Sequence, residues 1–161
     1  MASYALLLPC LIAVVFASRS TSGEPIKFDN CGDTEAPRCD ITNVKIDPCP
    51  EAATDEPCKI KRGNSATLTY NFTPRWAPGS GELKTRAYWA SVLDLPFLGM
   101  DTDVCKYATC PIVKDQQNFY NFTLEIEKRY PAQRYNIKFR IWEDEAEPKK
   151  ECCIVFKLKL T

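Results

Sequence analysis

The sequence contains no histidine among its 161 residues. Ser-His-Asp triads, Cys-His nucleophile pairs and the usual mixed Cys/His zinc sites all need an imidazole, so the sequence excludes them. It also lacks a Cys-x-x-Cys pair, the other common pattern of structural zinc ligands. We therefore expect no catalytic residue, no metal site and no cofactor.

Carboxylate chemistry is the one catalytic route that the composition leaves open. Asp101 and Asp103 form one acidic pair, and residues 143–147 are a second acidic cluster. A glycosidase pair or a calcium site could be drawn from such groups. Both clusters lie in expected turns beside proline or glycine, where acidic side chains are usually solvated, and the first lacks the other ligands of a calcium loop. We interpret both as loop surface.

Only one long apolar run is present, at residues 5–16, and it is too short to cross a bilayer. It has no polar face of the kind that a buried amphipathic helix would show, and small residues follow it. The pattern predicts a signal peptide at residues 1–22, cleaved between 17 and 23, although its start lacks a positive charge. We expect a single mature domain at residues 23–161 in a secreted protein, extracellular or lysosomal.

Charge and cysteine content narrow the class further. The 21 basic and 21 acidic residues are interspersed, so the sequence offers no basic stripe for a nucleic-acid partner. Removal of Cys10 with the signal peptide leaves an even number of cysteines, which in an exported chain indicates a disulfide framework. These are Cys31, Cys39, Cys49, Cys58, Cys105, Cys110, Cys152 and Cys153. Eight cysteines allow 105 pairings, and the count alone does not choose among them.

Apolar side chains recur with a period of two, which is typical of half-buried strands. This pattern covers residues 67–73, 119–126, 135–142 and 154–160. Further strands are expected at residues 26–29 and 41–46, with a long one at 84–97. About seven strands separated by turn signals predict an all-β, immunoglobulin-like sandwich of two antiparallel sheets.

Two N-glycosylation sequons fall on the polar faces of these strands. They are Asn71-Phe72-Thr73 and Asn121-Phe122-Thr123. A bulky glycan must point outward, so glycosylation is predicted at both asparagines. Asn121 is the stronger site, because Pro74 directly follows the first sequon.

An ordered set of motifs resembles the ML lipid-recognition family, which includes Niemann-Pick type C2 proteins and group 2 mite allergens. The most specific stretch is CKYATCPIVKDQQ at residues 105–117, and the motifs FDNCG, DPCP, PC and KRG precede it in order. The resemblance covers essentially the whole mature chain. It implies the same two-sheet sandwich without substantial helices.

The resemblance also implies a disulfide pairing. The first cysteine would pair with the last and two short loops would close locally, giving Cys31 with Cys153, Cys49 with Cys58, and Cys105 with Cys110. Cys39 and Cys152 are additional to the family pattern and would form a fourth bridge. The swapped pairing of the adjacent Cys152 and Cys153 remains open, since neighbouring residues on a strand face opposite ways.

In the family that this chain resembles, a hydrophobic ligand lies between the sheets. Family spacing around Cys105 and Cys110 places Phe97, Ile126 and Tyr130 in its lining, and we hypothesise that Phe97 and Tyr130 gate entry. The inward-facing secondary lining residues are Leu68, Tyr70, Leu124 and Phe139. Without the resemblance, such side chains would be interpreted as ordinary core.

The expected function is that of a secreted, non-enzymatic carrier of a small hydrophobic ligand, sterol and fatty acid being equally favoured. Proline stands only at Pro96 where vertebrate sterol carriers have an alternating run, and the loop between Cys49 and Cys58 is long, so the mouth of the pocket differs from theirs. The alternatives are a lipid-sensing immune or chemical-signal recognition protein and a structural sandwich with a filled core. A monomer with transient membrane or receptor contact is expected.

Overall fold

A computed structural model describes residues 23–31, 38–79, 83–143 and 150–161, and the predicted signal peptide lies outside them. Within these ranges the chain forms ten strands and two short 3-10 helices. The strands are β1 (Glu24–Pro25), β2 (Asp29–Asn30), β3 (Cys39–Asp47), β4 (Cys58–Ile60), β5 (Ser65–Pro74), β6 (Lys84–Ala90), β7 (Leu95–Pro96), β8 (Asn118–Glu125), β9 (Arg134–Trp142) and β10 (Glu151–Leu160). The helices are η1 (Pro50–Thr54) and η2 (Val104–Lys106).

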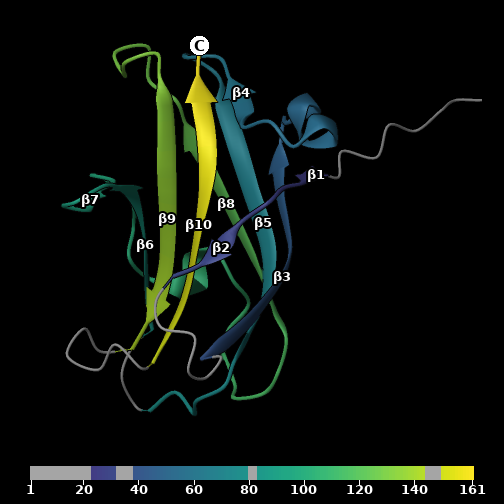
Figure 1. Ribbon diagram of the computed structural model, residues 1–161. Coiled ribbons are helices and arrows are strands. Elements are labelled where there is room, and N and C mark those ends of the chain that lie inside the picture. Colours follow the sequence, from purple (N-terminus) through teal and green to yellow (C-terminus); the bar gives the residue numbers. More distant parts are fainter. Residues whose placement is uncertain (1–22, 32–37, 80–82, 144–149) are drawn as a thin grey trace, which may run out of the picture.

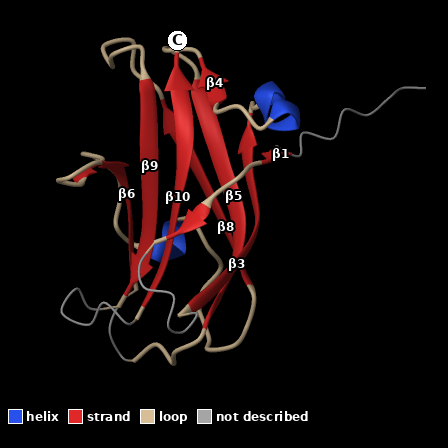
Figure 2. Ribbon diagram, viewed as in Figure 1, coloured by secondary structure: helices blue, strands red, loops and turns tan. Residues whose placement is uncertain are grey.

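The strands form two sheets that pack face to face (Figure 1). The smaller sheet has the order β1-β3-β5-β8, and the larger has the order β2-β10-β9-β6-β7, with β4 added beside β10. Every pairing is antiparallel except that of β4 with β10. Strands dominate the described residues (Figure 2), as the period-two pattern predicted.

Alternation in β5 and β8 shows how the sequence builds the core. Leu68, Tyr70 and Phe72 are buried at 4%, 2% and 1% exposure, whereas the residues between them are only half-buried. β5 pairs with β8 in an unbroken register from Ser65 opposite Glu125 to Phe72 opposite Asn118. Both strands therefore present their apolar side chains to the second sheet.

The long strand predicted at residues 84–97 is wrong. β6 ends at Ala90 and the chain reverses, so that Leu95 of β7 pairs with Trp89. Ser91 holds the turn, since its hydroxyl donates to the Leu93 carbonyl oxygen at 2.6 Å and its N–H donates to Asp94 at 3.3 Å. These local side-chain bonds offer the backbone an alternative to a continued ladder.

The strand predicted at residues 26–29 is also wrong. β1 pairs with β3 in the smaller sheet, and β2 pairs with β10 in the larger sheet. Residues 26–28 are therefore the crossing between two sheets, and β4 is a strand that the prediction missed. A run of four residues is too short for its period to separate a strand from a connection.

Four disulfides connect the elements: Cys31–Cys153, Cys39–Cys152, Cys49–Cys58 and Cys105–Cys110. Three of them are the pairs that the family resemblance implied, and Cys39–Cys152 is the additional fourth bridge expected, so the swapped pairing does not form. Cys39–Cys152 joins the start of β3 to the start of β10, with Cα atoms 5.0 Å apart, and so links the two sheets directly.

Candidate functional site

An apolar cavity lies between the two sheets. Its lining is apolar apart from Thr67, and its free volume is about 30 Å³. The smaller sheet and the residue after β8 contribute Ile46, Ala66, Thr67, Leu68, Phe122, Leu124 and Ile126. The larger sheet and the residue after β7 contribute Trp89, Phe97, Ile137, Phe139, Phe156, Leu158 and Leu160. By volume, this space holds about two water molecules.

The cavity occupies one end of the sandwich, which we call the upper end: it is the end at which β3 and β10 finish (Figure 1). Ile46 lies near the end of β3, and Leu158 and Leu160 lie at the end of β10. Ala66 and Ile137 lie near the starts of the antiparallel strands β5 and β9. Antiparallel pairing thus brings strand ends and strand starts together around one space.

Four aromatic rings cluster beside the cavity. The ring of Trp89 has its centroid 4.4 Å from that of Phe97, 4.5 Å from that of Tyr135 and 5.6 Å from that of Tyr130. Trp89, Tyr130 and Tyr135 are half-buried, whereas Phe97 is only 7% exposed. The partly exposed rings mark the mouth of the cavity, with Phe97 on its inner side.

The other half of the sandwich is filled. Phe139 packs edge-on against Phe122 at 5.3 Å, and behind this pair Tyr120 stacks on Tyr70 at 4.7 Å. The Tyr120 hydroxyl is 2.9 Å from Thr85, whose own hydroxyl donates to a backbone carbonyl oxygen at 3.0 Å. Tyr120 therefore donates to Thr85, and this layer closes the floor of the cavity.

Burial raises the pKa of the two tyrosines in the floor of the cavity, Tyr70 and Tyr120. Loss of solvent raises the pKa of Tyr70 well above its ordinary value, and the nearby Tyr120 raises it further. Burial likewise raises the pKa of Tyr120, against a smaller opposing effect of its hydrogen bond to Thr85. Both phenols stay neutral at any physiological pH, so the floor places no charge beside the apolar space.

The structure places five of the seven predicted ligand residues in the lining: Leu68, Phe97, Leu124, Ile126 and Phe139. The remaining two lie elsewhere. Tyr130 contacts Trp89 at the mouth, and Tyr70 lies in the filled half, stacked on Tyr120.

Trp89 is the lining residue whose omission matters most for the prediction. A signal for it existed, because Thr85, Ala87 and Trp89 alternate along β6 with the more exposed Lys84, Arg86 and Tyr88. The inward face of β6 is therefore visible in the sequence, and Trp89 lies on it.

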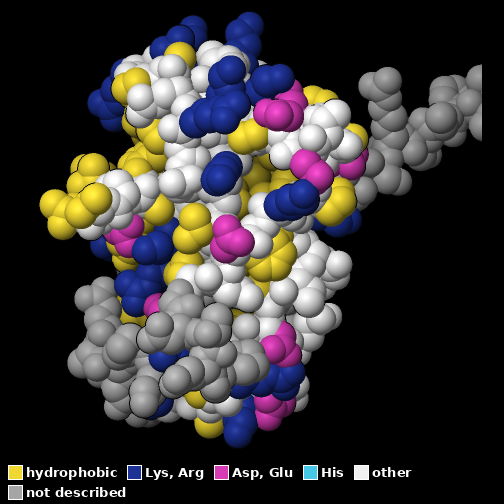
Figure 3. Space-filling model, viewed as in Figure 1, with side chains coloured by type: hydrophobic (Ala, Val, Ile, Leu, Met, Phe, Trp, Pro, Cys, Tyr) yellow, Lys and Arg dark blue, Asp and Glu magenta, His cyan; other side chains and the backbone are white. Residues whose placement is uncertain are grey.

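The hairpin between β6 and β7 projects beside the mouth and is apolar at its tip. Val92 is 102% exposed, Leu93 75%, Leu95 59% and Leu98 92%. Hydrophobic side chains form a projection over β7 at the left of Figure 3, and Lys and Arg side chains gather along the upper end. Large apolar side chains that cluster in the open usually mark a contact surface.

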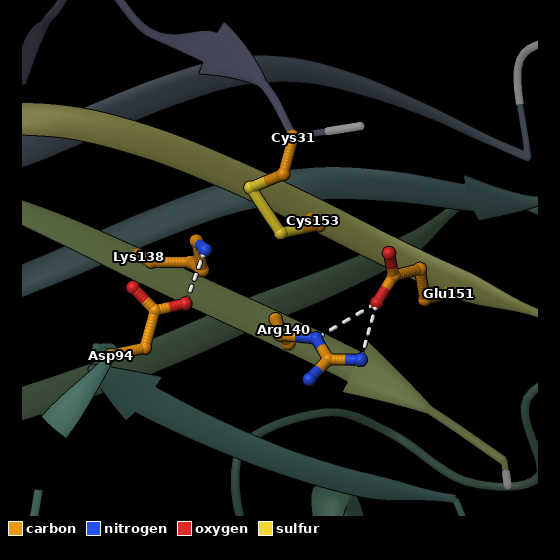
Figure 4. Close-up of a disulfide and its surroundings, with 6 residues drawn as sticks. All are labelled: Cys31, Asp94, Lys138, Arg140, Glu151 and Cys153. Carbon is orange, nitrogen blue, oxygen red and sulfur yellow. Dashed lines mark hydrogen bonds and ion pairs between the residues drawn. A yellow bond between two sulfur atoms is a disulfide. The ribbon is translucent and has the colours of Figure 1, made fainter. Parts of the chain in front are cut away.

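Ion pairs on the outer face of the larger sheet hold the hairpin and its neighbours in place (Figure 4). Asp94 of the hairpin pairs with Lys138 on β9. Arg140 contacts Glu151 through two nitrogens at 2.8 and 2.7 Å. Burial is the largest single influence and lowers the pKa of Arg140, but the hydrogen bond to Glu151, the charge of Glu151 and the nearby Tyr88 together outweigh it, so the pKa is raised.

A larger hollow of about 440 Å³ lies on the outside of the larger sheet, visible in Figure 3 as recessed hydrophobic atoms between charged side chains. Its floor includes Phe28 and Val155. Charges on its rim are already paired in part, as Lys27 contacts Asp55 at 2.7 Å. The hollow opens to solvent between surface segments, so the apolar cavity between the sheets is the better candidate for an enclosed ligand.

The acidic pair at Asp101 and Asp103 has a local structural use. Asp103 accepts from the Cys105 N–H and Asp101 accepts from the Asp103 N–H, both at 2.9 Å. Within the described residues, no group of three or more His, Cys, Asp or Glu side chains could hold a metal ion. No helix in the same ranges is long and apolar enough to cross a membrane. The acidic residues 144–147 lie outside the described ranges.

A family model of the ML domain matches residues 25–160, so the chain belongs to the ML-domain family. The MD-2-related lipid-recognition protein of Manduca sexta is 30% identical over 156 residues, which cover 96% of this chain and 95% of the relative. NPC intracellular cholesterol transporter 2 of Bos taurus is 29% identical over 136 residues, covering 83% and 86%.

Further comparisons agree with this assignment. The mite group 2 allergen Der f 2 of Dermatophagoides farinae is 29% identical over 132 residues, covering 81% of this chain and 80% of the allergen. The crystal structure of a Niemann-Pick type C2 protein from the Japanese carpenter ant superposes with a TM-score of 0.69 at 22% identity, covering 84% of this chain and 100% of the ant chain. At that identity the likeness establishes the fold, and it agrees with the immunoglobulin-like sandwich predicted.

Proposed function

We propose that this protein is a secreted, non-enzymatic carrier that binds one hydrophobic lipid, a sterol or a fatty acid, between its two sheets and passes it to an acceptor. The observation that carries the proposal is the apolar cavity at the upper end, with its half-buried aromatic mouth. Relatives named as a lipid-recognition protein and as cholesterol transporters support the ligand class.

Binding requires the cavity to enlarge. Its free volume of about 30 Å³ is far below the several hundred Å³ of usual ligand sites. Each buried methylene contributes about 0.8 kcal/mol, so an acyl chain of about ten methylenes contributes about 8 kcal/mol toward parting the sheets and ordering the ligand. The surplus over those costs sets the affinity.

Transfer needs a contact with the donor or acceptor, and the hairpin tip offers one. Val92 and Leu93 are fully or largely exposed, and Phe97, which follows the same hairpin, lines the cavity. Insertion of the tip into a lipid surface would bury these side chains and bring the mouth to the acyl region. A lipid leaving the cavity would then avoid crossing water.

The test is native mass spectrometry of the secreted, deglycosylated protein, followed by organic extraction and lipid identification. A stoichiometric sterol or fatty acid is expected, and its identity chooses between the two. An empty protein that also fails to take up fluorescent sterol and fatty acid would overturn the carrier proposal.

A lipid-sensing recognition protein is the second candidate, and the exposed hairpin favours it specifically. Such a protein would use Val92, Leu93 and Leu98 to contact a receptor rather than a bilayer. Two measurements separate these candidates. A lipid-dependent complex with another protein, detected by size-exclusion chromatography with light scattering, supports sensing. Transfer of lipid between pure lipid vesicles supports carriage.

A further inference from the structure

We propose that Asn121 carries an N-linked glycan whose first sugar packs on the ring of Phe119, and that Asn71 stays unmodified. This inference rests on one part of the proposed function, the export of the chain, and is independent of the lipid. It assigns a use to an aromatic side chain that the fold leaves in solvent.

Phe119 is the most exposed aromatic residue in the described part of the chain, with 53% of its surface accessible. It lies on β8, where Tyr120 and Phe122 point into the core. An exposed phenylalanine ring costs free energy in water unless something apolar covers it. Among the described residues, Phe119 belongs neither to the buried core nor to the side chains packed against it.

Alternation along β8 places Phe119 and Asn121 on the same face. Residues two apart on a strand point the same way, so both side chains stand on the outer surface of the smaller sheet. Asn121 is exposed, and its backbone is held by the ladder to Thr69 on one side and by an N–H bond to the Tyr107 carbonyl oxygen at 2.9 Å on the other. The strand therefore presents the ring and the asparagine at a fixed spacing.

A sugar attached at Asn121 has the right surface for this ring. The first N-acetylglucosamine presents C–H groups on one face of its pyranose ring, and these pack well against an aromatic face. Packing there removes apolar surface of both groups from water. The sequence order Phe119-Tyr120-Asn121-Phe122-Thr123 thus combines a sequon with its own platform.

The second sequon competes for the same ring from a poorer position. Asn71 lies directly opposite Phe119 on the neighbouring strand β5. It is half-buried, because β5 is flanked by β3 and β8, and Pro74 follows its acceptor Thr73. Asn121 is exposed even though residues 107–108 run along the outer side of β8, so it is the more accessible of the two asparagines. One glycan at Asn121 is therefore enough to cover the Phe119 ring.

The test begins with the full chain secreted from a eukaryotic host and glycopeptide mass spectrometry. One glycan, at Asn121, is expected. The glycan is then trimmed enzymatically to a single N-acetylglucosamine, and the melting temperature is compared with that of Asn121→Gln. The same pair is measured with Phe119→Ser and with Phe119→Tyr, and Asn71→Gln serves as the matched control at the other sequon.

The trimmed sugar should raise the melting temperature by about 2 °C with phenylalanine or tyrosine at position 119, and by less than about 0.5 °C with serine. Asn71→Gln should change neither the occupancy of Asn121 nor this gain. An unmodified Asn121, a glycan at Asn71, or a gain that survives Phe119→Ser would overturn the proposal. A protein that is lipid-loaded but unglycosylated would overturn this inference alone, whereas a glycosylated protein that binds no lipid would overturn only the carrier function.

Discussion

Replacing Phe97 with alanine should speed the exit of bound lipid. Phe97 is 7% exposed, lines the cavity, and has its ring centroid 4.4 Å from that of Trp89 at the mouth. Loss of the benzyl group would leave about two methylenes of the ligand without an apolar neighbour, at about 0.8 kcal/mol each. The resulting loss of about 1.6 kcal/mol corresponds to dissociation that is about 15-fold faster.

The assay loads the protein with a fluorescent fatty acid or sterol and follows its release into excess vesicles by stopped flow. Phe72→Ala is the matched control, because Phe72 is a 1% exposed phenylalanine in β5 that does not line the cavity. Core Phe→Ala changes cost about 3–5 kcal/mol of stability, so both variants should melt earlier. Only Phe97→Ala should release lipid faster. An unchanged release rate, or equal acceleration in Phe72→Ala, would refute the assignment of Phe97 to the mouth.

Serine at both Val92 and Leu93 should slow transfer to vesicles about tenfold or more without changing equilibrium binding, since both side chains are exposed; equal transfer by the variant would contradict contact through the hairpin. Tyr120→Phe should flatten the alkaline loss of stability in melting curves between about pH 9 and 11.5. The pKa of Tyr120 is raised in the folded protein, so its contribution to the free energy of unfolding is complete below the unfolded pKa near 10 and falls by about 1.4 kcal/mol per pH unit above it. If the variant lost stability with pH as steeply as the parent protein, ionisation of Tyr120 would not be the cause of the alkaline loss. Serine at Cys39 and Cys152 should cost about 2.5 kcal/mol in guanidinium unfolding rather than about 4.7, because Cys31–Cys153 still closes almost the same loop; the larger value would show that the two bridges act independently.

Strand faces were predictable wherever the contrast between the two faces was strong. In β9, Ile137, Phe139 and Ile141 are 2%, 3% and 0% exposed, while Lys138 and Arg140 between them point outward. The free energy of burying three large side chains fixes which face turns inward, and a slip of one residue would bury two charges instead. Such a pattern leaves one reasonable structure.

The hairpin was not predictable in the same way. Leu93, Leu95 and Phe97 alternate with Asp94 and Pro96, so the apolar pattern resembles a continuing strand and does not show the reversal of the chain. The turn depends on two local hydrogen bonds from Ser91 and on the pairing of Leu95 with Trp89. Both features depend on local backbone geometry, which the pattern of hydrophobic residues does not predict.

Alternation gives the face of a strand but not the height of a residue along the sandwich. Leu68 and Tyr70 share one face of β5, yet Leu68 lines the cavity and Tyr70 lies in the filled half. Height depends on where each strand begins relative to its partners, which is a property of the assembled sheets. Family spacing supplied that information for Phe97 and Ile126, both of which line the cavity.

The disulfide between the two sheets, Cys39–Cys152, and the cavity occupy opposite ends of the sandwich, and this arrangement affects where the sandwich can open. Cys39–Cys152 joins the two sheets at the starts of β3 and β10, in the half that the stacked Tyr70 and Tyr120 fill. At the upper end, the β3 side is tied through Cys49–Cys58 to β4, which pairs with β10. Within the described residues, no disulfide ties the side between β7 and β8 near the mouth, where Trp89 packs against Phe97 and Tyr130. The carrier proposal therefore predicts that the sheets part on this side, because aromatic contacts worth about 1 kcal/mol each break more readily than a disulfide bond.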